Sequence, residues 1–108
     1  MCVFQPHLYT RTRDFYEEFG KAFLLADVLI VTDVYPAREE PIQGITGELI
    51  ANAAVQFGHK GVHYVPDKKQ VPAYVVNIVK PGDIVITMGA GDITKYGNQI
   101  LELLKKKN

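Results

Sequence analysis

A histidine, a tyrosine and an arginine stand close together near the start of the chain, at His7, Tyr9 and Arg11. They lie in a segment, residues 4–12, that joins an expected strand to an expected helix. A cation and hydroxyl donors at the start of a helix add to the positive end of the helix dipole, so this segment can hold a carboxylate or a phosphate. Arg11 is the strongest candidate, because guanidinium forms bidentate pairs with such anions. The alternative is a solvated turn in which Thr12 caps the helix.

A second polar segment spans residues 33–42 and contains Asp33, Tyr35 and Glu39 together with two prolines, Pro36 and Pro41. It is too polar and too stiff to be a minimal connector, since proline lowers the entropy of a loop. The adjacent carboxylates Glu39 and Glu40 can hold a cation or a substrate amine. Equally, Arg38 can pair with one of them at the surface.

A third segment, Gly89-Ala90-Gly91-Asp92, precedes the last expected helix. Its glycines let the backbone approach a ligand closely. It lacks the full G-x-G-x-x-G dinucleotide fingerprint, and the chain has no G-x-x-x-x-G-K-[ST] phosphate loop. We therefore do not expect this chain to hydrolyse ATP alone.

The elements that must position these residues follow from hydrophobic periodicity and from turn residues. The pattern predicts strands over 3–4, 27–34, 62–65 and 83–88, and helices over 12–24, 46–57, 67–78 and 93–105. Alternating strands and helices predict a doubly wound α/β fold with a mainly parallel sheet and helices on both faces. The continuous apolar run at 27–34 should be a central strand. Ligands gather at the carboxyl ends of such strands, so the three segments should share one edge.

The length and composition of the chain limit the class of protein to which it can belong. The 108 residues fit a single domain, 1–108, and the formal net charge of zero gives no electrostatic reason to expect a nucleic-acid or membrane partner. The single cysteine, Cys2, cannot form an internal disulfide, and no apolar run is long enough to span a bilayer. These features predict a cytoplasmic protein. His59 and His63 fall at the opposite edge from the three segments, and we interpret both as structural.

Taken together, the three segments resemble the carboxy-terminal domain of the Mur ligase family, and the match covers nearly the whole chain. The strings Phe-Gln-Pro-His-x-Tyr-x-Arg-Thr and Asp-Val-Tyr-x-Ala-x-Glu-x-Pro-Ile resemble those of the UDP-N-acetylmuramate–L-alanine ligases and of the related murein-peptide ligases. The Gly-Ala-Gly turn is common to more of the family. The resemblance implies a Rossmann-like domain that brings an amino acid to a partner domain carrying the phosphate loop.

The resemblance also implies the reaction. In this family the carboxylate of UDP-N-acetylmuramate is phosphorylated by ATP with Mg²⁺, and the amine of L-alanine attacks the acyl phosphate to form an amide. His7 and Arg11 would meet the amino acid, with Arg11 gripping its α-carboxylate. Asp33, Tyr35 and Glu39 would shape the pocket, and Tyr9, Gly89, Gly91 and Asp92 complete the expected site. No metal ligand is expected, and neither ATP nor Mg²⁺ should bind this chain by itself.

The chain departs from the family pattern at two places. Some members have a second arginine after the histidine, where this chain has Leu8. The strand and helix with an Asp-Tyr-x-His-His-Pro string, which normally begin the domain, are absent, so we expect a truncated domain that is inactive alone. Two other readings stay open: a murein-peptide ligase domain, and a stand-alone α/β module that binds a small anion.

Overall fold

The computed structural model of the chain describes residues 1–89 and 92–107. Within these residues, four strands and four α-helices alternate, with one short 3₁₀ turn before the third helix. Their bounds are β1 (Cys2–Gln5), α1 (Tyr9–Ala22), β2 (Leu29–Val31), α2 (Glu48–Gln56), β3 (Val62–Tyr64), η1 (Lys68–Gln70), α3 (Val71–Ile78), β4 (Ile86–Gly89) and α4 (Ile93–Lys107). The predicted order of elements is confirmed.

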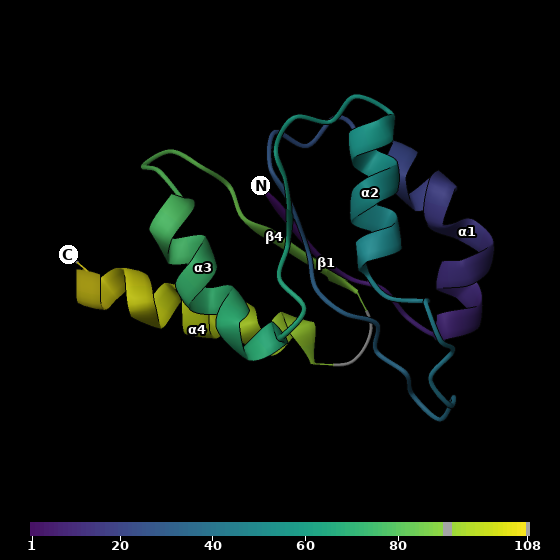
Figure 1. The fold of residues 1–108 in the computed structure, drawn as a ribbon. Coiled ribbons are helices and arrows are strands. Elements are labelled where there is room, and N and C mark those ends of the chain that lie inside the picture. Colours follow the sequence, from purple (N-terminus) through teal and green to yellow (C-terminus); the bar gives the residue numbers. More distant parts are fainter. Residues whose placement is uncertain (90–91, 108) are drawn as a thin grey trace.

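The strands form one parallel sheet in the order β3-β2-β1-β4. Figure 1 shows α1 and α2 side by side on one face of the sheet, and α3 and α4 on the other. The doubly wound, Rossmann-like α/β fold expected from the sequence is therefore confirmed. The β2 strand lies between β3 and β1, and its three residues are fully buried, as its apolar run predicted.

Alternate residues of β1 and β2 build two cores, because successive side chains of a strand point to opposite faces. Val3 and Ile30 pack with residues of α3 and α4 on one face. Phe4 and Leu29 pack with residues of α1 and α2 on the other, where the Phe4 ring lies 4.8 Å from that of Phe23. These cores fix the sheet and thereby the loops at its carboxyl edge.

The first helix begins earlier than the sequence indicated. It starts at Tyr9, so Thr12 is not its cap: Thr12 is buried inside α1, and its hydroxyl donates to the carbonyl oxygen of Leu8 at 2.9 Å. The predicted apolar face is also incomplete, because Phe15 has non-helical dihedral angles and is half exposed. A bond available inside the helix outcompeted the cap that Thr12 was expected to form.

The observed boundaries of the other helices and strands lie closer to the predicted ones. The Thr46 hydroxyl accepts a bond from the amide of Glu48 at the start of α2, and Gly58, with φ of 102°, follows its end. Asp67 caps as predicted, but the helix it opens first makes the η1 turn. The described part of the last strand begins at Ile86, three residues later than expected.

The β4 strand lies at the free edge of the sheet. Ile86 and Met88 pair in register with Cys2 and Phe4, which places them on the face covered by α1 and α2. Neither helix extends over β4, and both side chains are about half exposed. No described helix is both long and apolar enough to cross a membrane.

Candidate functional site

The loops that follow β1 and β2 continue the pairing of the sheet beyond its strands. The backbone of Tyr35 donates to the carbonyl of Pro6 at 2.8 Å and accepts from the amide of Leu8 at 2.9 Å. This parallel bridge sets the ring of His7 against that of Tyr35, with centroids 6.0 Å apart and planes 26° from parallel. Two of the expected site residues, 28 positions apart in the sequence, are thus brought together.

Arg11 lies in the first turn of α1, two residues after Tyr9. Its side chain is exposed and forms no ion pair with any residue in the described parts of the chain. A guanidinium without an internal partner is available to an anion from outside. Tyr9 contributes its backbone amide to the local structure, and its side chain is partly buried.

The start of α1 is occupied by the chain's own carboxylate. One oxygen of Glu39, Oε1, accepts from the amides of Tyr9 at 2.6 Å and Thr10 at 3.2 Å, and the Thr10 hydroxyl donates to Oε2 at 2.6 Å. The Thr10 hydroxyl bond is the main reason why the pKa of Glu39 lies below its ordinary value. The amides expected to hold a foreign anion therefore already hold Glu39.

Asp33 serves the start of the second helix. Its Oδ1 accepts from the amide of Val34 at 2.8 Å and from that of Gly47, next to α2, at 3.1 Å. Because Gly47 has no Cβ, its backbone can lie against Thr32, whose carbonyl oxygen would stand 2.2 Å from an added Cβ. Asp33 thus anchors the beginning of α2 beside the end of β2.

The expected residues Gly89 and Asp92 lie at the end of β4 and directly before α4. Gly89 has φ of 140°, and an added Cβ would lie 2.5 Å from the carbonyl oxygen of Gln5, so glycine is needed here for close approach to the neighbouring strand. Asp92 pairs with Lys68 at 2.6 Å, and this hydrogen bond lowers the pKa of Asp92. Ala90 and Gly91 lie outside the described residues.

A small polar pocket of about 250 Å³ opens at this edge between the ends of β1, β2 and β3. Asp33, Tyr35 and Lys68 line it, and the Lys68 ammonium lies 5.8 Å from the centre of the Tyr35 ring. A larger hollow of about 710 Å³ lies between α4 and residues 79–87, and none of the expected site residues lines it. The polar pocket is lined by Gln5 of the first segment and by residues of the second, whereas Asp92 of the third segment is linked to it through its pair with Lys68.

Two residues at this pocket were missed from the sequence, Gln5 and Lys68. Gln5 is 3% exposed, and its Oε1 has no hydrogen-bond partner among the described residues. Lys68 follows β3, whose carboxyl end lies at the same edge as the other three. The topological rule that grouped three loops could have found this fourth one.

The two histidines expected to be structural have partners inside the fold. His59 Nδ1 accepts from the amide of Gly61 at 3.0 Å, before β3 begins. His63 Nδ1 lies 2.5 Å from the Tyr74 hydroxyl, which ties β3 to α3. Among the described residues, no group of three or more histidine, cysteine, aspartate or glutamate side chains could hold a metal ion.

Known proteins resemble this chain in sequence and in fold. Residues 1–91 match the family model described as "Mur ligase, glutamate ligase domain". The UDP-N-acetylmuramate–L-alanine ligases of Salinibacter ruber, Cutibacterium acnes and Rhodococcus jostii are 50%, 54% and 56% identical over 105, 107 and 105 residues, covering 97%, 99% and 97% of this chain.

The same alignments cover 22%, 22% and 20% of those relatives, so the chain spans about a fifth of their length. The solved structure of the UDP-N-acetylmuramate-alanine ligase MurC of Thermotoga maritima superposes with a TM-score of 0.70 at 23% identity, covering 99% of this chain and 20% of that one. That likeness concerns the fold. By the family match and by these relatives, the chain belongs to the Mur ligase family and corresponds to its glutamate ligase domain.

Proposed function

We propose that this chain is the carboxy-terminal domain of an ATP-dependent ligase that joins L-alanine to UDP-N-acetylmuramate in peptidoglycan precursor synthesis. The observation that carries the proposal is the exposed Arg11 guanidinium, unpaired among the described residues, at the start of a helix that follows the His7–Tyr35 pair. Relatives that share half or more of their aligned residues with this chain have the name of that ligase.

In this proposal the domain binds and orients the amino acid. Arg11 donates a bidentate pair of hydrogen bonds to the α-carboxylate, while His7 and Tyr35 form the adjoining wall. Asp33 and Glu39 hold the loops, and Tyr9, Gly89, Gly91 and Asp92 complete the surroundings. Fixing the carboxylate aims the amine at an acyl phosphate presented by the rest of the enzyme, which is catalysis by orientation.

ATP and Mg²⁺ belong, in this proposal, to other domains of the longer protein. The described side chains offer no cluster that would hold a metal ion by itself, and the sequence has no phosphate loop. UDP-N-acetylmuramate is likewise a substrate of the complete enzyme, which we place in the cytoplasm. Nucleic acid and membrane are not among the partners we propose.

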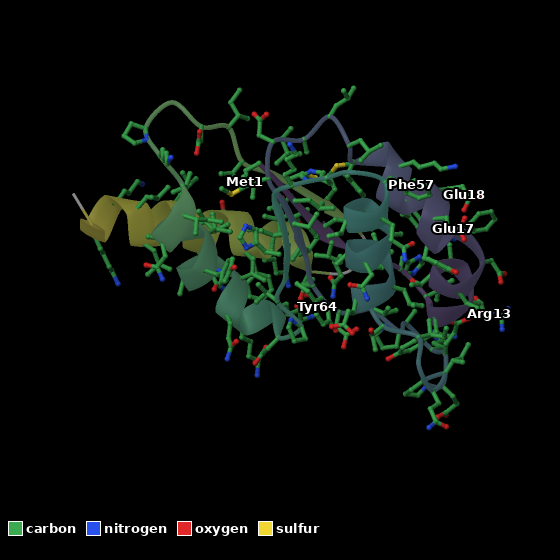
Figure 2. The ribbon with its side chains drawn as sticks, turned by 45° about the horizontal axis from the view of Figure 1, so that its top comes forward. Met1, Arg13, Glu17, Glu18, Phe57 and Tyr64 are labelled. Atoms are coloured by element: carbon green, nitrogen blue, oxygen red, sulfur yellow. The ribbon has the colours of Figure 1, made fainter. Side chains whose placement is uncertain are left out.

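The role of Arg11 is tested in the full-length ligase. Arg11→Ala should raise the KM for L-alanine roughly tenfold to a hundredfold, because a hydrogen bond to a charged group is lost, and should leave the KM for ATP unchanged. Arg13→Ala is the matched control: Arg13 lies on the outer side of α1 (Figure 2) and pairs with Asp14 at 2.9 Å. An unchanged KM for L-alanine in Arg11→Ala would refute this role.

The same assay separates the alternatives. Coupling of a tripeptide in place of L-alanine would identify a murein-peptide ligase. A native reading frame that encodes no phosphate-loop domain beside this chain, together with no coupling activity, would favour a stand-alone module for a small anion.

A further inference from the structure

The cap of α1 comes from a distant part of the sequence. Leu8 occupies the cap position with φ of 70°, outside the range that a leucine usually adopts, and its side chain cannot accept a hydrogen bond. The first amides of a helix have no partner within the helix. Here the partner is Glu39, thirty residues away from Tyr9.

Both oxygens of Glu39 are engaged in this contact. Oε1 accepts hydrogen bonds from the amides of Tyr9 and Thr10, and Oε2 accepts one from the Thr10 hydroxyl. All three donors lie in the first turn of α1. An anion at this position is also favoured by the helix dipole. The neighbouring Glu40 is exposed and forms no ion pair with any other described residue.

This contact joins the two polar segments at a second point. The backbone bridge holds Tyr35 against residues 6–8, and four residues later Glu39 holds the same loop against residues 9–10. Arg11 follows directly in the chain. The position of the Arg11 backbone is therefore set by a turn of helix that is held on one side by Leu8 and on the other by Glu39.

We infer that Glu39 is a positioning residue for the amino-acid site, acting through the first turn of α1 and not by touching the substrate. This inference rests on the proposed function and gives Glu39 a different role from that of a pocket residue. Glu39 accepts hydrogen bonds from the first amides of α1, so these amides are not available to the substrate. The substrate carboxylate is therefore bound by the side chain of Arg11. Removing Glu39 releases the loop and the helix start together.

The test compares two substitutions in the full-length ligase. Glu39→Gln keeps an oxygen for the two amides and a group that can pair with the Thr10 hydroxyl, so the KM for L-alanine should stay within about threefold of the original. Glu39→Ala removes every bond and should raise that KM roughly tenfold to a hundredfold, as displaced binding groups do, with the KM for ATP unchanged. Glu40→Ala is the matched control and should have no effect.

A merely structural role would lower the amount of active enzyme without changing the KM for L-alanine. An unchanged KM in Glu39→Ala would therefore overturn the inference, and so would Glu39→Gln if it were as defective as Glu39→Ala, because Gln keeps an acceptor for the α1 amides and the missing hydrogen bonds could then not explain the defect. A wild-type enzyme that couples no L-alanine would instead overturn the proposed function.

Amide exchange tests the contact independently of activity. In the 108-residue chain, the amides of Tyr9 and Thr10 should exchange faster in Glu39→Ala than in Glu39→Gln, which retains an acceptor. Equal exchange in the two variants would contradict the contact from which the inference starts.

Discussion

At the residue scale, the helix start that looked like a site for a foreign anion is filled from within. The sequence indicated correctly that this position favours a carboxylate. It did not indicate whose carboxylate, because Tyr9 and Glu39 are thirty positions apart and meet only after the β1 and β2 loops pair. The ligand-binding role of the segment then depends on side chains, above all on Arg11.

The lowered pKa of Glu39 gives a pH dependence of stability. A carboxyl group whose pKa is lower in the folded protein contributes stability that is complete above its ordinary pKa and is lost as the pH falls through the folded value. The difference in free energy of unfolding between the wild type and Glu39→Gln should therefore shrink from neutral pH to about pH 3. Denaturant unfolding across this range measures it.

The hydrogen bond to Lys68 also lowers the pKa of Asp92. Asp92 is present in both the wild type and Glu39→Gln, so its contribution to the pH dependence cancels when the two are compared. Glu40→Gln is the control, and its difference from wild type should not depend on pH in this way. A constant difference for Glu39→Gln would show that Glu39 does not hold α1 through its charge.

At the scale of the elements, α1 and α2 pack so closely that a glycine is required between them. A Cβ at Gly20 would lie 2.8 Å from both the Cβ of Ala53 and the amide nitrogen of Ala54. Neither atom belongs to the far end of a flexible side chain, so the two helices would have to separate. The spacing of these helices positions α1 over the sheet, and with it the turn that carries Arg11.

Gly20→Ala should lower the free energy of unfolding by about 1–3 kcal/mol, as overpacking does. Gly97→Ala is the matched control in α4: the nearest atoms to an added Cβ there, in Thr87, are 3.8 Å away, which is ordinary contact. That change should stabilise the protein by about 1 kcal/mol, the difference in helix propensity. Urea unfolding measures both, and equal signs would contradict the close packing of α1 on α2.

Element order and type could be predicted because apolar periodicity records which faces are buried. The limits of β2 could not, since apolar residues such as Val28 and Val34 continue on both sides and only Leu29–Val31 lie between neighbouring strands. The start of α1 was misplaced for a related reason. Thr12 has the side chain of a cap, but its hydroxyl bonds to Leu8 within the helix.

At the scale of the whole molecule, the site is an open edge. Its polar pocket is about 250 Å³ and shallow, and the side chain of Arg11 is exposed to solvent. An amino acid bound there would keep much of its surface in water, and solvent weakens a charged pair. The relatives are about five times as long as this chain, and we propose that their other domains close over this edge.

The 108-residue chain alone should therefore bind L-alanine weakly or not at all and should form no amide bond from the substrates. Leu8, where some family members have a second arginine, leaves fewer donors for the carboxylate. Isothermal calorimetry with L-alanine measures this. Tight binding that is lost in Arg11→Ala would show that the chain forms a complete amino-acid site by itself.

The sequence by itself determined the fold class and the family, and it predicted the sheet edge at which we propose the site, because periodicity and short motifs record local burial and local chemistry. Only the tertiary structure decided the partners: Glu39 with α1, His7 with Tyr35, Lys68 with Asp92, and Gln5 beside Gly89. Each of these contacts joins residues that belong to, or follow, two different strands. Their geometry depends on strand order and register, which no local pattern contains.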